Sequence, residues 1–466
     1  MNTAGSAFTT QGPRDAEPVV IVGGGLAGLA AAAALAEAGI DSMVLETRRH
    51  AGGRAASFED PVSGGLVDAC QHVAMGCCTN FLDLCRRTGL ADALRRDRTL
   101  SFIGPDGRRA DCTPSRLLPA PLHLAPLLLG MRHFTLREKA ALARGMMRLA
   151  RPVVDAETRT ALDWLRAVGQ PEPVIRFFWQ PVIESALGES IDLVSLAAAR
   201  KVAVDGFLAH RDAADLIVPT EPLGTLFGTR LVAWLRGRGV TVQTGTAATG
   251  FDRDGDRIVA VRCGEQRVPC AAAIVAVPWR QAARLVPDVV PAADERLVGS
   301  PITAVHLWFD RDVVDVPHAV LVGRVSQWVF RGESAGHCQV VISASRGLMD
   351  GDRERLRDTV VAELRDIFPP AREARLLDAR VVTDPTAVLS VRPGVEAVRP
   401  GSRTAVANLF LAGDWTATGW PSTMEGAIRS GRVAAEAAGR ALGRPITALV
   451  ADLPRGPLVR LLAGRR

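Results

Sequence analysis

The chain has 466 residues, more than one hydrophobic core usually spans, so we expect two domains. It is 48% hydrophobic and 23% charged, which indicates a globular rather than a disordered protein. The net charge is +6, but the sequence contains no dense basic run with interleaved aromatic residues. Nucleic acid is therefore not an expected partner. The cysteines lack the paired C-x-x-C spacing of a zinc site, so we expect no metal and a reducing, cytoplasmic location.

Residues 18–46 predict a dinucleotide-binding βαβ unit. The β-branched run Val19–Val22 has the length and type of a fully buried strand. Three glycines follow at G-x-G-x-x-G spacing, and then come an Ala/Leu-rich helix and a second buried strand, Ser42–Leu45. The alternative is a structural βαβ turn, but the order of strand, glycines, helix, strand and terminal acid favours a dinucleotide site.

Each residue of this unit has a physical role. Gly23 allows the tight turn, Gly25 lets the backbone approach a pyrophosphate, and Gly28 lets helix and strand pack closely. The helix N-terminus at Leu26–Ala27 offers N–H groups and a positive dipole end to the phosphates. Glu46 can accept hydrogen bonds from ribose hydroxyls and would repel an extra 2′-phosphate.

A second glycine turn follows at once. Arg48 precedes Gly52, Gly53, Arg54 and Ala55, and Arg54 could reach the pyrophosphate or the ring edge of a long cofactor. The pattern E-x-R-x-x-x-G-G-R-A resembles the amine oxidase and phytoene desaturase superfamily, and this resemblance implies FAD as the cofactor. The alternative is a surface loop with an ordinary arginine.

The middle of the chain alternates between helical and strand-rich segments. Residues 114–134 are very apolar but interrupted by prolines, so they are either a buried segment or a lip that dips into a membrane. Residues 135–210 read as helices, the first capped by Thr135 with Glu138. Residues 299–346 are strand-rich and suit an antiparallel sheet that forms one wall of a pocket.

A second strong signal lies at residues 408–442. Leu409–Ala412 predicts a buried strand, Gly413 a close turn, and Asp414 a carboxylate that could bind the ribityl hydroxyls. A long Ala-rich helix is predicted to begin at Ser422-Thr423-Met424, with Ser422 and Glu425 as a capping box. The positive end of its dipole could stabilise negative charge on a reduced flavin ring.

More specific motifs narrow the resemblance. D-x-x-Q-H-V at residues 68–73 and L-W-F-D at residues 307–310 resemble the squalene-associated FAD-dependent desaturase group, whose named activity is hydroxysqualene dehydroxylation. The likeness covers nearly the whole chain beyond the first 17 residues. Ala69 and Cys70 stand where that family usually has Asn-Gly, which leaves the substrate less certain than the cofactor.

The expected fold class is therefore α/β: a Rossmann-type FAD-binding domain with a discontinuous α+β substrate domain. The FAD-binding domain is predicted from residues 18–80, 220–295 and 395–442. The substrate domain is predicted from residues 81–219, mostly helical, and 296–394, an antiparallel sheet. Residues 1–17 are predicted as a disordered tail and 443–466 as a basic, solvated C-terminal tail.

The family reaction replaces an allylic hydroxyl by hydride, which needs an acid near the leaving oxygen and a site that tolerates a developing cation. His72 and Asp68 are the candidate acids, since the family fold implies that their turn lies near the ring; a packed histidine and a capping aspartate are the alternative. The candidate aromatic faces are Trp415 and Trp420 beside the flavin helix, with Trp179 and Trp328 from the substrate domain.

Three functions remain open from the sequence. The first is reductive dehydroxylation of a long apolar isoprenoid. The second is oxidative, a carotenoid-type desaturase or an amine oxidase, although an amine oxidase would favour a Tyr cage and the chain has no Tyr. The third is a non-catalytic, FAD-bound partner of a prenyl synthase. Only one G-x-G-x-x-G unit is present, so we expect an external electron donor, and a peripheral membrane contact is a further expected partner.

Overall fold

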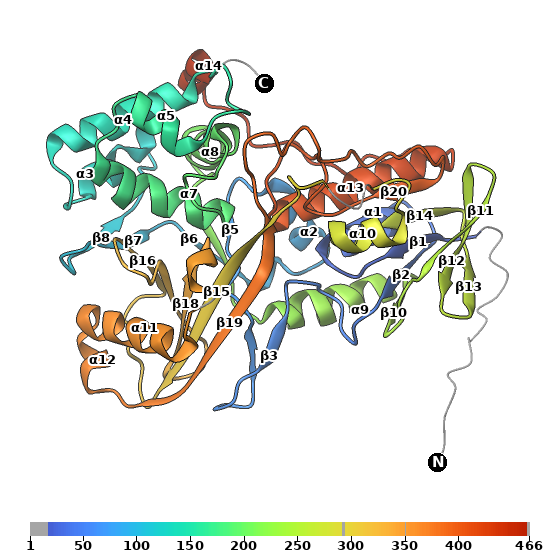
Figure 1. Cartoon of the computed structure of the whole chain (residues 1–466), viewed down its shortest axis with the longest axis horizontal. Helices are drawn as coiled ribbons and strands as arrows, with labels where there is room; N and C mark the ends of the chain where they lie inside the picture. The colour runs from blue at the N-terminus through green and yellow to red at the C-terminus, as the bar shows by residue number, and fades with distance from the viewer. Residues whose placement is uncertain (1–16, 291–293, 350, 464–466) are drawn as a thin grey trace.

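The computed structural model describes residues 17–290, 294–349 and 351–463. A parallel-sheet lobe lies beside a second lobe, in which helices stand above a large mixed sheet (Figure 1). Of the predicted N-terminal tail, only Glu17 belongs to the described residues. Across the described residues, no helix combines the length and apolarity needed to cross a membrane.

The first lobe is built on a five-stranded parallel sheet. Its strands, in spatial order, are β10 (Thr241–Thr244), β2 (Ser42–Glu46), β1 (Val19–Val22), β14 (Ala272–Val275) and β20 (Leu409–Leu411). Every neighbouring pair is parallel. β1 and β14 are fully buried because one face of the sheet packs on helices and the other packs on a cluster that includes Ile258, Val261 and Trp279. The predicted Rossmann-type α/β fold is confirmed.

Two helices pack closely on this sheet. They are α1 (Leu26–Glu37) and α13 (Met424–Ala441), which lie side by side in Figure 1. A Cβ at Gly431 of α13 would lie only 2.0 Å from the carbonyl oxygen of Ala27, so the two backbones are nearly in contact. The small residues that line both helices therefore set their spacing. The smaller elements of this lobe are α2 (Thr79–Arg87), α9 (Leu231–Arg236), α10 (Trp279–Leu285), β11 (Gly250–Asp254), β12 (Arg257–Cys263) and β13 (Gln266–Pro269).

The second lobe contains a seven-stranded sheet. Its order is β19 (Leu376–Leu389), β15 (Gly299–Phe309), β18 (His337–Ile342), β17 (Trp328–Arg331), β16 (His318–Leu321), β7 (Leu100–Ile103) and β8 (Arg109–Cys112). All neighbours are antiparallel except β16 and β7. The amphipathic helix α11 (Arg353–Ile367) adds its apolar side chains to the hydrophobic cluster of this sheet.

Helices form the other part of the second lobe: α3 (Ala125–Gly130), α4 (Leu136–Ala150), α5 (Ala161–Ala167), α7 (Gln180–Leu187) and α8 (Leu196–Lys201). The predicted capping box at the start of α4 is present, with Thr135 and Glu138 as its two members. Shorter strands link the lobes: β3 (Ser57–Glu59) pairs with β4 (Leu66–Asp68), and β9 (Leu216–Pro219) joins β5 (Ala74–Met75) and β6 (Leu94–Asp97).

The C-terminal segment differs from the predicted solvated tail. Ile446 and Ala448 pack against the core of the parallel-sheet lobe. Helix α14 (Pro457–Ala463) then buries Val459 against Ala120 and Ala150 of the helical part. The chain end thus crosses from one lobe to the other. The residue numbers proposed for the domain boundaries stay predictions.

Candidate active site

The first glycine turn places free N–H groups at the edge of the parallel sheet. Gly23 has φ +112°, a conformation that favours glycine, and a Cβ at Gly28 would lie 1.9 Å from the Gly23 carbonyl oxygen. Helix α1 begins just after Gly25 with no side-chain cap and no acidic residue in its first turn. Its N-terminal N–H groups and positive dipole end are therefore available to an anion.

Glu46 ends β2 beside this turn. Its Oε2 accepts a hydrogen bond from the Gly24 amide at 2.7 Å, and its Oε1 accepts one from the Arg48 amide at 2.8 Å. These bonds hold the carboxylate at the carboxyl end of the strand, where a ribose would lie. Glu46 and Arg48 both line the cavity described below.

The second glycine turn packs directly onto the first. Gly52 donates to the Gly24 carbonyl at 2.8 Å, and a Cβ at Gly53 would lie 3.0 Å from the Cα of Gly25. A side chain at Gly53 would therefore crowd the first turn. Arg54 follows and reaches across to the far end of the chain, where its Nη2 lies 2.5 Å from Asp414 Oδ1.

Asp414 joins the three segments of the site. It follows β20 and is buried, paired with Arg54 and with the hydroxyl of Ser422. Arg54 also donates to the Ala387 carbonyl at 2.7 Å, and the Leu389 amide donates to Ser422 Oγ at 3.0 Å. One carboxylate therefore ties the second glycine turn to the start of the last long helix.

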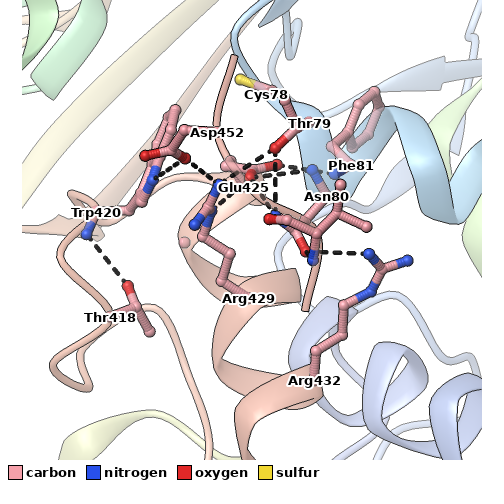
Figure 2. A network of polar contacts seen from close by, with 12 residues as sticks. Cys78, Thr79, Asn80, Phe81, Thr418, Trp420, Glu425, Arg429, Arg432 and Asp452 are labelled. Atoms are coloured by element: carbon pink, nitrogen blue, oxygen red, sulfur yellow. Dashed lines mark hydrogen bonds and ion pairs between the residues drawn. The ribbon is translucent and has the colours of Figure 1, made fainter. Parts of the chain in front are cut away.

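The predicted N-cap of that helix is wrong by one residue. α13 begins at Met424, and its cap is Thr423, whose hydroxyl accepts from the Gly426 amide at 3.1 Å. The predicted capping box fails because Ser422 is bound to Asp414. Its other member, Glu425, is turned to the amides of Asn80 and Phe81 at the start of α2, at 3.1 and 2.7 Å (Figure 2).

A single cavity of about 1280 Å³ runs from these turns into the second lobe. It exceeds the roughly 300–1,000 Å³ typical of small-molecule pockets. Most predicted cofactor residues line it: Gly23, Gly25, Leu26, Ala27, Glu46, Arg48, Gly53, Arg54, Ala55, Gly413, Asp414, Ser422, Thr423 and Met424. Gly28 lies behind the wall as a packing residue. Beyond them the wall is mainly apolar, with Leu127, Leu142, Met146, Phe178, Val320 and Phe330 among its members.

His72 lines the cavity, but its protonation differs from the prediction. Its Nδ1 lies 2.7 Å from the Cys70 carbonyl oxygen, which can only accept, so Nδ1 carries the proton and Nε2 is left as an acceptor. Burial lowers the pKa of His72 below its ordinary value, and the charge of Arg54 lowers it further. A neutral ring with its proton on Nδ1 has no proton to give from Nε2, which does not suit the predicted role of His72 as an acid.

Asp68 is not among the cavity-lining residues. It ends β4, and its Oδ1 accepts from the Ser57 hydroxyl and from the Leu223 amide, both at 2.7 Å. Burial raises the pKa of Asp68 to about 6. The carboxyl therefore joins strands β3 and β4 to the helical turn that begins at Leu223, and its predicted role as an acid at the substrate is not supported by its position.

Two predicted aromatic faces also lie elsewhere. Trp415 is fully buried in the parallel-sheet lobe, and its Nε1 donates to the Val277 carbonyl at 2.9 Å. Trp179 is buried among the helices and donates to Gln170 at 2.9 Å. Neither is a cavity-lining residue, since each side chain is turned into a core. Trp328 does line the cavity and stacks on Phe330, with ring centroids 5.6 Å apart.

Trp420 lines the cavity, but two protein cations already lie against its ring. Lys201 Nζ is 4.4 Å and Arg429 Cζ is 4.8 Å from the ring centroid. The ring is therefore already in contact with protein cations, and the role of Trp420 toward a developing carbocation stays a prediction. Lys201 was missed from the sequence. The signal was available: it is one of two lysines in a chain that uses arginine at nearly every other basic position.

These residues fit FAD. An uncapped helix N-terminus, a strand-end carboxylate and a cationic Arg54 meet along one cavity that is long enough to extend beyond the dinucleotide turns. The fold and the site define an FAD-dependent oxidoreductase.

Comparison with known proteins gives the family. The model of the flavin containing amine oxidoreductases matches residues 26–438, and the chain belongs to this family. It is 30% identical over 441 residues to a hydroxysqualene dehydroxylase of Rhodopseudomonas palustris, covering 91% of this chain and 99% of that protein. It is 26% identical over 483 residues to a 15-cis-phytoene desaturase of Synechococcus elongatus, covering 92% and 99%. Cyclohexylamine oxidase from Brevibacterium oxydans shares the fold, with a TM-score of 0.68 at 17% identity over 92% of this chain and 100% of that one.

Proposed function

We propose that this protein removes the hydroxyl group of hydroxysqualene reductively, giving squalene. The observation that carries the proposal is the cavity, which continues from the dinucleotide turns as a long, mainly apolar space suited to an isoprenoid chain. Support also comes from the relatives named hydroxysqualene dehydroxylase, at 30% and 28% identity over nearly the whole chain. The motifs at residues 68–73 and 307–310 point to the same group.

The protein groups divide the work of the reaction. FAD, when bound and fully reduced, would supply both the hydride that replaces the hydroxyl and the proton with which the hydroxyl leaves as water. The glycine turns and Glu46 hold the dinucleotide, and the Arg54–Asp414 pair fixes the second turn against the start of α13. The apolar walls bind the chain and exclude water from the reacting carbon. Neutral His72 offers Nε2 as an acceptor to the hydrogen of the substrate hydroxyl, which orients the oxygen.

The developing allylic cation needs an electron-rich face. The stacked rings of Trp328 and Phe330 line the cavity and replace Trp415 in this role. Among the described residues, no Lys or Arg side chain makes a cation–π contact with either ring. This pair is therefore the part of the wall best able to stabilise positive charge.

An oxidative desaturase is the second candidate. Phytoene desaturases are relatives at 25–26% identity over most of the chain, and desaturation would need the same cofactor and the same kind of apolar cavity. An amine oxidase is less well supported, since the chain has no Tyr for a cage, and the solved amine oxidases are similar in fold alone.

One experiment separates these functions. Chemically reduced, anaerobic holoenzyme is incubated with hydroxysqualene, and oxidised holoenzyme with phytoene, and both extracts are analysed by mass spectrometry. Squalene from the first incubation, matched by flavin reoxidation, supports the proposal. Desaturated product from the second alone overturns it in favour of a desaturase. If neither incubation gives a product, the remaining hypothesis is a non-catalytic partner of a prenyl synthase.

We also propose that the substrate enters from a membrane surface through residues 114–134. Leu117, Leu122 and Leu129 are 92%, 51% and 63% exposed, and Leu122 also lines the cavity. Arg211 donates to the Arg116 carbonyl at 2.9 Å beside these leucines, so cationic groups flank the apolar surface as an anionic bilayer would favour. A cytoplasmic, peripheral location and an external electron donor follow as parts of the same proposal.

Vesicle flotation tests the membrane face. Holoenzyme should float with anionic phosphatidylglycerol vesicles, and Leu117→Asp should reduce the floated fraction severalfold. The control is Leu377→Asp, which alters a 47% exposed leucine of β19, outside residues 114–134. Equal flotation of both variants and the unaltered protein would contradict this entry face.

A further inference from the structure

We propose that Lys201 binds the oxygen atom of the substrate where charged side chains interrupt the mainly apolar wall of the cavity. The inference rests on the proposed function for the identity of the ligand, an isoprenoid alcohol. Lys201 is the last residue of α8 and lines the cavity, with its side chain 21% exposed. A lysine so placed has lost much of its hydration, so its ammonium needs partners.

Two partners fix the ammonium in place. Nζ donates to Asp205 Oδ2 at 3.1 Å, one helical turn further along, and it lies 4.4 Å from the Trp420 ring centroid. Asp205 is shared, since its Oδ1 lies 3.8 Å from Arg455 Nη2. An ammonium has three N–H donors. Asp205 is its hydrogen-bond acceptor among the described residues, so two donors remain for a ligand.

Trp420 is itself held rigidly, which makes it a fixed platform for Lys201. Its Nε1 lies 3.3 Å from Asp452 Oδ1, and the same carboxylate pairs with Arg429 (Figure 2). Arg429 in turn donates from Nε to Glu425 Oε1 at 2.6 Å. The network therefore anchors the ring to α13 and to the C-terminal segment, so Lys201 faces a surface that cannot easily move.

The side chains around Lys201 and Trp420 favour a ligand that presents a neutral oxygen atom. Lys201 and Arg429 both lie against the Trp420 ring, so positive charge on a ligand is disfavoured here. A hydrocarbon gives the free N–H groups nothing to bind, whereas a hydroxyl oxygen accepts them. Asp205, Glu425 and Asp452 balance the three cations Lys201, Arg429 and Arg455, which favours a neutral alcohol over an anion.

Lys201 would thus make the site bind the alcohol substrate in preference to its hydrocarbon product. His72 is neutral near pH 7 because burial lowers its pKa, so it does not offer a cation to the oxygen. Lys201 does, so the two side chains can hold the same hydroxyl, with His72 accepting its hydrogen and Lys201 donating to its oxygen. We expect the alcohol to bind more tightly than squalene because squalene leaves this ammonium without a ligand.

The test compares the two ligands on oxidised holoenzyme, where no turnover occurs. Hydroxysqualene and squalene are titrated separately and followed by the flavin absorbance change, for the unaltered protein, Lys201→Met and Lys139→Met. Methionine keeps the apolar stem and removes the charge. Lys139 is the matched control, since it is the other lysine and its Nζ donates to Leu129 O rather than lining the cavity.

Lys201→Met should weaken hydroxysqualene binding by about 10- to 100-fold, the loss expected for a hydrogen bond to a charged group, and change squalene binding by less than about twofold. Lys139→Met should bind both ligands as the unaltered protein does. Equal weakening of both ligands, or no change in either, would overturn the inference. The inference would also be overturned if Lys201→Met shifted the reduction potential of the flavin without changing the ligand preference, because Lys201 would then interact with the flavin rather than with the substrate. Failure of turnover with the preference intact would refute the proposed reaction and leave the inference on Lys201 standing.

Discussion

Gly431→Ala probes the contact that sets the shape of the cofactor site. Gly431 lies inside α13 and faces α1, and an added Cβ would come within 2.0 Å of the carbonyl oxygen of Ala27 and 3.0 Å of its carbonyl carbon. These are backbone atoms, so no side-chain rotation can relieve the clash. One helix must move, and Ala27 belongs to the first turn of α1, which lines the cavity.

The expected magnitude comes from two opposing effects. Replacing glycine by alanine inside a helix normally stabilises it by about 0.5–1 kcal/mol. Overpacking a close interface costs about 1–3 kcal/mol, and more where the backbone must shift. We therefore expect Gly431→Ala to lower the free energy of unfolding by roughly 1–2 kcal/mol or more. Because α1 would be displaced, FAD affinity should fall with it.

Thermal unfolding of holoenzyme and FAD titration of the apoprotein measure the two effects. The control is Gly130→Ala at the end of α3, where the nearest atom to an added Cβ is Cys112 Sγ at 3.5 Å, an ordinary contact. Gly130→Ala should match the unaltered protein in both assays. If Gly431→Ala were equally stable and bound FAD equally well, the proposed tight contact of α1 and α13 would be refuted.

Three further outcomes follow from the site. Since burial raises the pKa of Asp68 to about 6 in the folded state, the free energy of unfolding should fall as pH rises from about 4 to 6, and Asp68→Asn should lack this loss in urea titrations at each pH. His72→Leu removes the acceptor that orients the substrate hydroxyl, so it should lower turnover at least about tenfold with FAD content unchanged, and unimpaired turnover would remove His72 from the mechanism. Arg54→Met should reduce FAD content after dialysis, because it leaves the buried Asp414 without its cation; full retention would contradict that role.

The dinucleotide unit could be predicted because its signals are local. Val19–Val22, the glycines and Glu46 occur in the order that the parallel sheet requires, and the structure places them at one edge of it. The capping rule shows where such reasoning ends. Thr135 and Glu138 obey it at the exposed N-terminus of a helix. Ser422 and Glu425 have the same pattern but are bound by Asp414, Asn80 and Phe81, partners that sequence spacing does not reveal.

Other features depend on contacts between distant segments. The strand β19 could not be located within the sheet predicted for residues 296–394, because Asp378, Arg380 and Pro385 interrupt its apolar pattern. The register of β19 against β15 shifts opposite Pro301, and this shift accommodates Pro385. Trp415 follows Asp414 directly, yet the turn aims its ring into the core rather than at the cavity. Lys201 and Trp420 are 219 residues apart in the chain (420 − 201), so only the tertiary fold brings them together.

The most direct test of the proposed function is its stoichiometry. Fully reduced holoenzyme is mixed anaerobically with excess hydroxysqualene in a stopped-flow spectrometer, and squalene is quantified after the flavin absorbance becomes constant. The proposal predicts one squalene formed for each flavin reoxidised, and no spectral reduction when oxidised holoenzyme meets the same alcohol. Flavin that stays reduced with hydroxysqualene unconsumed, or oxidised flavin that becomes reduced by it, would contradict reductive dehydroxylation.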